Sequence, residues 1–276
     1  MVGSSMRKLA GYLSQMAFHQ LMIRVEKALD QQEIALGVFL NIEGAFNNTP
    51  YDSMCATLVR HGVDHTIVWW IRATLEGQRV TATLGGLSRS VAVSRGCPQG
   101  GVLSPLLWCL VVSELLTRLS VGGVYAQGYA DDICLLAVGK FQNTVSGLIQ
   151  WALYIVETWC DKLILSVNPD KTWLIAFTRR RKLPGFFEPW FGTTLQCSMS
   201  VKYLGVILDS RLTWNKHLEV KVRKAENSLW ACRRACGRAW GPGTQGGSLA
   251  LLLCHQAFRH LCILGMVTWL SDSQCQ

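Results

Sequence analysis

The sequence predicts an α+β domain, in which strands and helices follow one another without a regular alternation. Short apolar segments such as residues 34–40 and 133–138 have the length and composition of strands, whereas residues 12–30 and 142–165 repeat apolar side chains at helical spacing. Their order lacks the strand–helix–strand repeat of a parallel sheet. Half of the 276 residues are hydrophobic, so the chain can bury a sizeable core and is not a disordered protein.

The first hundred residues predict a helix, a strand, two helices and a hairpin. In order, these elements cover residues 12–30, 34–40, 51–61, 64–78 and 80–93. The hairpin is predicted because two runs of β-favouring residues flank Gly85-Gly86, and paired glycines supply the positive φ angles that a tight turn requires.

The rest of the chain predicts a second hairpin, at residues 124–138, surrounded by helices. A long apolar helix covers residues 102–119, and an amphipathic helix at 142–165 is followed by strands at 172–177 and 201–208. A basic amphipathic helix covers 214–240, and Gly241-Pro242-Gly243 ends it because these residues break helices.

The second hairpin carries the most informative residues, because Tyr129-Ala130-Asp131-Asp132 lies between its two strands. Adjacent carboxylates at a tight turn repel each other, and a bound cation relieves this repulsion. Mg²⁺ is the usual cation at such a site, since it binds one or two carboxylates together with substrate phosphates. A two-ion site needs a further carboxylate from another strand, but the residue that follows the strand 34–40 is Asn41.

A glycine-rich segment, Ser94–Pro105, leads into the long apolar helix. Glycines let a ligand approach the backbone, and the free N–H groups of a helix N-terminus bind phosphates. Gln99 offers a donor and an acceptor to a nucleotide. The alternative is that glycine and proline only cap the helix and, taken alone, these residues favour that alternative.

The net charge of +9 comes entirely from one part of the chain. Residues 179–238 contain 13 Lys and Arg against four Asp and Glu, and the remaining residues contain 14 of each. This concentration favours a surface for a polyanion, in particular a nucleic acid, over the alternative of a solvated helix face.

Cysteine usage and the chain ends predict an intracellular protein, cytoplasmic or nuclear. The 11 cysteines are scattered singly and form no CxxC pair, which favours free thiols in a reducing compartment over a disulfide framework or a zinc site. The first residues lack a signal peptide. Residues 248–270 are apolar, but His255 and Arg259 interrupt them, so we predict a buried amphipathic helix and no membrane partner.

Five segments carry a resemblance to a known family, in that family's order: Phe39–Asn47, Gly96–Gly100, Tyr129–Asp132, Asn168–Thr172 and Lys202–Val206. Together they resemble the palm motifs of reverse transcriptases, in particular those of insect non-LTR retrotransposons of the jockey-like or ribosomal-DNA-inserting groups. The resemblance extends from about residue 14 to residue 240. Group II intron maturases and telomerase-like enzymes share the palm, but the second and fifth segments fit the retrotransposon group better.

The resemblance implies the right-hand palm of a polymerase, an antiparallel sheet backed by helices, with a helical thumb and with the fingers largely missing. We expect the palm and a remnant of the fingers in residues 1–178, a primer-grip hairpin and basic thumb helix in 179–240, and a diverged C-terminal helix in 241–276. Only 33 residues precede the first palm strand, and the endonuclease domain and cysteine–histidine knuckle of the family are absent, so we expect a truncated copy.

The resemblance also implies a two-metal polymerase site. Asp131 and Asp132 correspond to the acidic pair that holds two Mg²⁺ ions, with Mn²⁺ as a substitute. Asn41 occupies the place of the family's first catalytic aspartate, and the backbone of Ile42 corresponds to a further metal ligand. Two ions about 3.5–4 Å apart activate the primer 3′-hydroxyl and stabilise the leaving pyrophosphate. Lys171 corresponds to a lysine that protonates pyrophosphate, although a lone lysine at a strand edge is usually only solvated.

Further residues correspond to those that bind the substrates. The dNTP would contact Gly44, Ala45, Phe46, Gln99 and Gly100, with Phe46 as a steric gate against the ribose 2′-hydroxyl rather than an ordinary core residue. The primer grip would be formed by Tyr203, Leu204 and Gly205. The thumb helix would contact the nucleic-acid backbone through Lys221, Arg223, Lys224, Arg233 and Arg234.

The sequence therefore predicts the RNA-directed DNA polymerase domain of a non-LTR retrotransposon, which binds an RNA template, a DNA primer and dNTPs without a stable protein partner. Asn41 can lend an oxygen to Mg²⁺ but carries no charge, so we expect a rate several powers of ten lower than with aspartate at this position. The alternative is a catalytically inactive relic that retains only nucleic-acid binding.

Overall fold

The computed structural model describes residues 2–98, 100–180, 190–191 and 193–235. The chain divides into two compact units. One unit is formed by residues 16–201, and the other combines residues 1–15 with residues 202–276. The first unit contains the acidic hairpin, and the second contains the basic helix.

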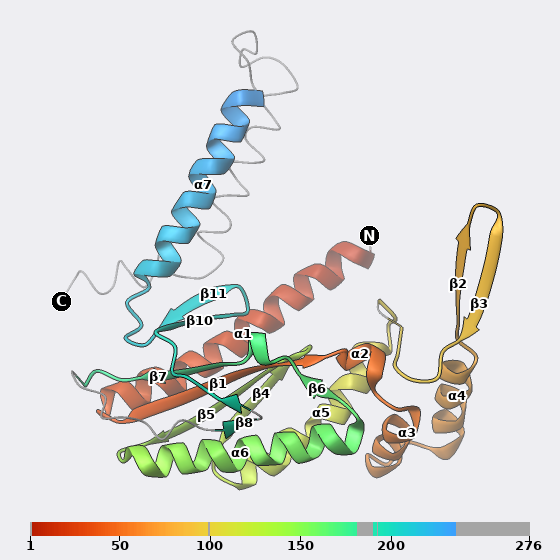
Figure 1. Cartoon of the computed structure of the whole chain (residues 1–276), viewed down its shortest axis with the longest axis horizontal. Helices are drawn as coiled ribbons and strands as arrows, with labels where there is room; N and C mark the ends of the chain where they lie inside the picture. Colours follow the sequence, from red (N-terminus) through yellow and green to blue (C-terminus); the bar gives the residue numbers. More distant parts are fainter. Residues whose placement is uncertain (1, 99, 181–189, 192, 236–276) are drawn as a thin grey trace. The chain divides into compact units, whose positions relative to one another are not determined.

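A five-stranded antiparallel sheet forms the centre of the first unit (Figure 1). Its central strand is β1 (Ile34–Glu43), with β5 (Asp132–Gly139) on one side and β4 (Tyr125–Tyr129) beyond it. On its other side, β1 pairs first with β7 (Trp173–Phe177) and then, at its end, with β6 (Ser166–Val167). This sheet and its helices confirm the predicted α+β class.

Alternate residues of β1 face opposite sides of the sheet, as strand geometry requires. Leu36, Val38 and Leu40 belong to a core that includes residues of α5 (Ser104–Val121) and α6 (Gln142–Leu163). Asn41, at an odd-numbered position, therefore points to the opposite face. Residues 16–30 of helix α1 (Val2–Asp30) lie over part of that face, where the Arg24 guanidinium is 3.9 Å from the centre of the Tyr125 ring.

Three helices and a ribbon connect β1 to α5. The helices are α2 (Ala45–Asn48), α3 (Tyr51–Arg60) and α4 (His65–Glu76). The ribbon consists of β2 (Arg79–Leu84) and β3 (Leu87–Ala92), and every residue of both strands is exposed. Its turn confirms the glycine prediction, because Gly85 and Gly86 have φ angles of 56° and 84°.

Shorter elements complete the first unit. They are the 3₁₀ helix η1 (Pro169–Lys171) and the two-residue strands β8 (Trp190–Phe191) and β9 (Thr193–Thr194). The predicted helix at 248–270 lies outside the described residues.

Several predicted boundaries were wrong. Helix α1 begins at Val2, ten residues before the predicted start at residue 12. Strand β1 continues to Glu43 because β6 pairs with Ile42 and Glu43, so Asn41 lies inside the strand rather than after it. Helix α5 begins at Ser104 rather than at residue 102. Pro105 lies in its first turn, where a backbone N–H would have no intrahelical partner, so the missing N–H of proline costs nothing there.

Among the described helices, α5 is long and apolar enough to cross a membrane by length and composition. A single helix of this kind is weak grounds for a membrane protein, because the core helix of a soluble domain passes the same test. Leu107, Val111, Leu115 and Leu119 of α5 are buried in the core beneath the sheet.

The second unit contains a hairpin followed by a long helix. Strand β10 (Ser200–Tyr203), which crosses the boundary between the units, and β11 (Val206–Asp209) are joined by Leu204 and Gly205. These two residues have φ angles of 47° and 82° and form a turn. The single strand that the apolar pattern predicted over 201–208 is therefore wrong, whereas the resemblance implied a hairpin at this place. Helix α7 (Asn215–Ala235) follows, and residues 236–240 of the predicted helix lie outside the described residues.

Candidate active site

The acidic pair lies at the tip of the β4–β5 hairpin, as predicted. Tyr129 and Asp132 are the last paired residues, which leaves Ala130 and Asp131 in the turn. Ala130 has a φ of 52°, a conformation that side chains other than glycine rarely adopt. Its carbonyl accepts a hydrogen bond of 2.5 Å from the indole nitrogen of Trp108 in α5, which stabilises this conformation.

Asn41 lies directly opposite Asp132 in the β1–β5 register. Its Nδ2 donates to Oδ2 of Asp131 at 2.8 Å and to Oδ1 of Asp132 at 3.0 Å. The backbone N–H of Ile42 donates to the carbonyl of Asp131 at 2.8 Å and fixes the turn to β1. The carboxylates of both aspartates therefore converge on a single nitrogen atom. The Asn41 residue that carries it is only 9% exposed.

The environment of Asp132 disfavours its charged form. Burial, and next the negative charge of Asp131, raise the pKa of Asp132 above its ordinary value. The hydrogen bond from Asn41 and the positive charge of Lys171 act in the opposite direction but do not cancel the increase. A divalent cation between the carboxylates would favour the charged form of Asp132, because two positive charges would face the two negative ones.

The donor set at this point fits a cation that prefers oxygen ligands. Two carboxylates converge on one position, and a half-turn of the Asn41 amide would direct its oxygen there in place of its nitrogen. Among the described residues, no group of three or more His, Cys, Asp or Glu gathers at one point. The site therefore offers two negative charges and one neutral amide.

Lys171 lies in η1, close enough to the acidic site for its positive charge to lower the pKa of Asp132. Asn168 holds η1 in place: its backbone N–H donates to the carbonyl of Asn41 at 2.9 Å, and its side chain accepts from the N–H of Lys171 at 3.2 Å. The Asn168 amide also donates to Glu43 at 2.9 Å. The end of β1 thus positions the lysine as well as the acids.

The glycine-rich segment docks on α2, which carries Phe46. The N–H of Cys97 donates to the carbonyl of Phe46 at 2.6 Å, and the N–H of Gly96 donates to the carbonyl of Thr49 at 2.8 Å. A Cβ on Gly96 would lie 2.3 Å from the carbonyl oxygen of Asn47, so only glycine fits at this position. Gly100 is exposed, whereas Gln99 lies outside the described residues.

Gly44, Ala45 and Phe46 lie where β1 ends and α2 begins. Gly44 has a φ of 61°, and any Cβ there would lie 2.1 Å from the side-chain nitrogen of Asn48. The Phe46 ring is half-buried against the core, with its centre 6.0 Å from that of Trp108. Trp108 therefore contacts Phe46 and also holds the turn of Asp131. The sequence did not single out Trp108, because both contacts depend on the tertiary structure.

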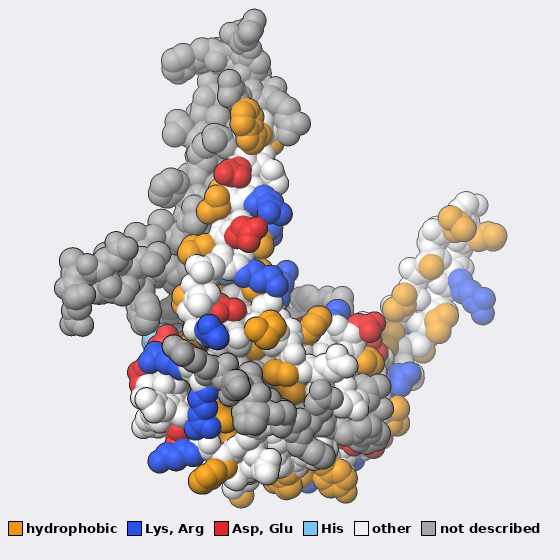
Figure 2. All heavy atoms as spheres, turned by 60° about the vertical axis from the view of Figure 1, so that its left-hand side comes forward, with side chains coloured by type: hydrophobic (Ala, Val, Ile, Leu, Met, Phe, Trp, Pro, Cys, Tyr) orange, Lys and Arg blue, Asp and Glu red, His pale blue; other side chains and the backbone are white. Residues whose placement is uncertain are grey.

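The second unit contains the residues predicted for primer and duplex binding. Tyr203 is buried, and Leu204 and Gly205 form the turn after it. Burial lowers the pKa of Lys221, and the charges of Lys224 and Lys202 lower it further, which indicates crowded cations on this unit. Arg223 and Lys224 are exposed on α7, where basic side chains are visible along the helix (Figure 2), and Arg223 pairs with Glu219 at 3.0 Å. Arg233 and Arg234 also lie in α7, but their side chains lie outside the described part of the chain.

Residues 4–208 match the reverse transcriptase (RNA-dependent DNA polymerase) family, and this match includes the acidic hairpin, β1 and the glycine-rich segment. The chain belongs to this family. The reverse transcriptase domain is 28% identical over 228 residues to the probable RNA-directed DNA polymerase from transposon BS of Drosophila melanogaster, covering 78% of this chain and 24% of the relative.

Two further relatives come from named mobile elements. The RNA-directed DNA polymerase from mobile element jockey of Drosophila funebris is 29% identical over 207 residues, covering 72% of this chain and 22% of the relative. The putative 115 kDa protein in type-1 retrotransposable element R1DM of Drosophila melanogaster is 27% identical over 213 residues, covering 76% and 20%. These relatives confirm the predicted resemblance to the reverse transcriptases of non-LTR retrotransposons. The chain spans between 20% and 24% of the length of these relatives.

The reverse transcriptase domain also resembles a solved structure, that of apo telomerase from Candida tropicalis truncated from the C-terminal domain. The TM-score is 0.52 at 12% identity, over 74% of this chain and 41% of the telomerase chain. At this identity the similarity supports the fold alone, which is a mixed α/β polymerase fold with antiparallel sheets.

Proposed function

We propose that this chain is the palm and thumb of an RNA-directed DNA polymerase, which adds deoxynucleotides to the 3′-hydroxyl of a DNA primer on an RNA template. The observation that carries the proposal is the convergence of the Asp131 and Asp132 carboxylates on one point beside β1, in a chain of the reverse transcriptase family. We assign the palm to residues up to 178, and the primer grip and thumb to residues 179–240.

Asp131 and Asp132 would hold Mg²⁺, or Mn²⁺ in its place, and the Asn41 amide oxygen and the Ile42 backbone would complete the protein ligands. When bound, two such ions lower the pKa of the primer hydroxyl and stabilise the leaving pyrophosphate. Lys171 would give a proton to the pyrophosphate, since its positive charge already acts at Asp132.

The incoming dNTP would bind beside α2, against Gly44, Ala45 and Phe46 and the docked segment that contains Gln99 and Gly100. Support comes from the two backbone hydrogen bonds that hold this segment on α2. Phe46 would exclude a 2′-hydroxyl, because its contact with Trp108 limits the movement of its ring.

The second unit would bind the primer and the duplex. Tyr203, Leu204 and Gly205 would grip the primer end, and Lys221, Arg223, Lys224, Arg233 and Arg234 would contact phosphates. The net charge of +9 over residues 179–238 supports this assignment, because phosphate contacts account for most of the affinity for a duplex.

A second candidate function is nucleic-acid binding without catalysis. The hydrogen bonds of Asn41 favour it, because one neutral amide satisfies both carboxylates in the absence of any cation. A site that is satisfied in this way binds Mg²⁺ less tightly than three carboxylates would, since each carboxylate adds a charge.

Primer extension on an RNA template, with Mg²⁺ or Mn²⁺, tests the two candidates. The chain is compared with Asn41→Asp and with Asp131→Ala/Asp132→Ala. We expect Asn41→Asp to raise the rate by several powers of ten, by analogy with the loss on removing one member of a catalytic group. The alanine pair should abolish extension while leaving primer–template binding unchanged.

Three outcomes separate the possibilities. Extension by the unchanged chain that is lost in the alanine pair would show that two carboxylates suffice. Extension only after Asn41→Asp would show a site disabled at one position. Binding of the primer–template without extension in any variant would favour the second candidate function.

A further inference from the structure

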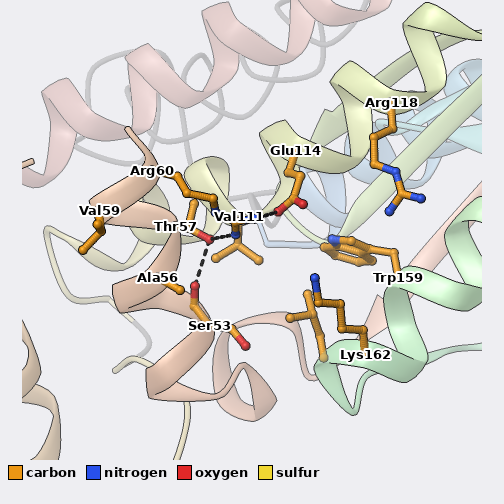
Figure 3. A pocket seen from close by; sticks show the side chains of 11 residues that line it. Ser53, Ala56, Thr57, Val59, Arg60, Val111, Glu114, Arg118, Trp159 and Lys162 are labelled. Carbon is orange, nitrogen blue, oxygen red and sulfur yellow. Dashed lines mark hydrogen bonds and ion pairs between the residues drawn. The ribbon is translucent and has the colours of Figure 1, made fainter. Parts of the chain in front are cut away.

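A cavity with a volume of about 430 Å³ lies between α3, α5 and α6 of the first unit (Figure 3). This volume is within the range of sites for small organic ligands, which is roughly 300–1,000 Å³. None of the residues assigned to metal, dNTP or primer binding lines the cavity. The polymerase reaction therefore does not account for it.

The charged residues that line the cavity are mostly basic. Arg60, Arg118 and Lys162 supply three positive charges, and Glu114 supplies one negative charge, so the net charge is +2. Arg60 pairs with Glu114 at 2.8 Å and donates to the hydroxyl of Thr57 at 3.0 Å, so its charge is already balanced.

Arg118 and Lys162 have no ion pair with any residue in the described part of the chain. In Figure 3, the Arg118 guanidinium from α5 and the Lys162 ammonium group from α6 lie on either side of the Trp159 ring. Two cations thus border the cavity without an ion-pair partner among the described residues, and a bound anion would supply the opposite charge.

The remaining wall is apolar. Ala56, Val59, Val111 and Leu163 line it, and only 3% of Trp159 is exposed. A fully hydrated inorganic ion would leave this apolar wall in contact with water, whereas a ligand with an apolar part would cover it. The lining therefore favours an organic anion over a simple ion.

The basic residues also have a structural explanation. Arg60, Arg118 and Lys162 each lie in the last turn of their helix, where a cation interacts favourably with the free carbonyl groups. This interaction would account for their positions without any ligand. The two explanations differ in one measurable respect, because removing a helix-end cation lowers stability but does not change the affinity for an anion.

We propose that this cavity binds a small organic anion, with its phosphate or carboxylate group between Arg118 and Lys162 and its apolar part against Val111 and Leu163. The ligand would be held by charge-assisted hydrogen bonds at one end and by burial of apolar surface at the other. The proposal goes beyond the polymerase function and does not depend on it, since binding requires neither Mg²⁺ nor a primer.

Titration of the ¹⁵N-labelled chain tests the proposal, with phenyl phosphate and phenylacetate as probes. The readout is the indole N–H resonance of Trp159, assigned by its disappearance in Trp159→Phe. We expect a saturable shift of this resonance, and at least a tenfold weaker dissociation constant for Arg118→Gln/Lys162→Gln. The matched control is Arg89→Gln/Lys140→Gln, which removes the same charges outside the cavity and should change the constant by less than twofold.

The relative affinities of the two probes then assign the anion: tighter phenyl phosphate indicates a phosphoryl ligand, and tighter phenylacetate indicates a carboxylate. Absence of a saturable shift would overturn the proposal. So would an equal loss of affinity in the control pair, because the attraction would then be general. Lower thermal stability of Arg118→Gln/Lys162→Gln with unchanged affinity would also overturn it and would assign the cations to the helix ends.

Discussion

At the scale of single residues, Asn41 decides the chemistry of the acidic hairpin. Its amide donates to Asp131 and Asp132 together, and so replaces repulsion among carboxylates with two hydrogen bonds. The same neutrality limits the attraction of the site for Mg²⁺, because the site has two charges instead of three. Stability without metal and affinity for metal therefore oppose each other at this one position.

The raised pKa of Asp132 predicts that this residue destabilises the fold at neutral pH. A carboxyl group whose pKa is higher in the folded state contributes stability below its unfolded pKa and loses that contribution as the pH rises through the folded pKa. We therefore expect Asp132→Asn to increase the urea concentration at the unfolding midpoint at pH 7, and to increase it less at pH 4.

Exposed Asp170, changed to Asn in η1, serves as the control for this measurement. It should leave the midpoint nearly unchanged at both pH values. The quantity to compare is the difference in urea midpoint between Asp132→Asn and the unchanged chain. If this difference is no larger at pH 7 than at pH 4, the raised pKa of Asp132 does not destabilise the fold.

At the scale of elements, α5 supports the catalytic hairpin through Trp108. We expect Trp108→Phe, which keeps a ring but removes the donor to Ala130, to lower the free energy of unfolding by about 1–2 kcal/mol. Amide exchange of residues 125–139 should become faster, because the turn would lose a contact that holds its positive φ angle.

Trp159→Phe is the matched control, since Trp159 contacts the same ring of Trp108 at 6.2 Å without bonding to the hairpin. Faster exchange of the hairpin to the same extent in both variants would mean that ring packing, and not the hydrogen bond, stabilises the turn.

His217 of helix α7 forms a hydrogen bond with the β10–β11 hairpin. The Nδ1 of His217 accepts from the N–H of Ile207 at 3.1 Å, and its buried Nε2 has no hydrogen-bond partner among the described residues. Burial, and next the charge of Lys221, lower the pKa of His217. The neutral ring thus contributes stability above the unfolded pKa, about 6.5, and loses it as the pH falls, because the protonated ring cannot accept the bond.

We expect the protection of α7 amides, corrected for intrinsic exchange, to fall between pH 7.5 and pH 5.5. His217→Gln should remove most of this pH dependence, since a glutamine oxygen can accept the bond but does not titrate in this range. His61→Gln, at an exposed histidine of the other unit, should leave it in place. If protection falls as much in His217→Gln as in the unchanged chain, His217 is not the cause of the pH dependence.

At the scale of the whole molecule, positive charge is concentrated in the residues that follow the sheet. We expect Arg223→Gln/Lys224→Gln to weaken binding to a primer–template duplex and to reduce the slope of log affinity against log salt by about 2, since each phosphate contact contributes about 0.9. Fluorescence anisotropy across a salt series measures both effects.

The control for this binding experiment is Arg89→Gln/Lys140→Gln, which removes two charges from the first unit. Equal slopes for the two double variants would mean that the charge of α7 attracts nucleic acid only through the general field of the protein and makes no specific phosphate contact.

Much of this architecture could be predicted because its signals are local. Glycine pairs, apolar runs and helical spacing identified the ribbon, the acidic hairpin and the helices α3 to α6 to within a few residues. The end of β1 was missed, because its last residues pair with β6, more than a hundred positions further along the chain. The apolar pattern also missed the turn at Leu204, since leucine does not favour positive φ angles, and only the resemblance implied a hairpin there.

The sequence by itself determined the family, the acidic pair and the departure at Asn41, because each depends on residue identity in a short segment. Only the tertiary structure decided that the Asn41 amide bonds to both acids, that Trp108 holds their turn, and that Arg118 and Lys162 face one cavity. The physical reason is that hydrogen bonds and charges act over a few ångströms, and strand register and helix packing bring such distant residues within that range.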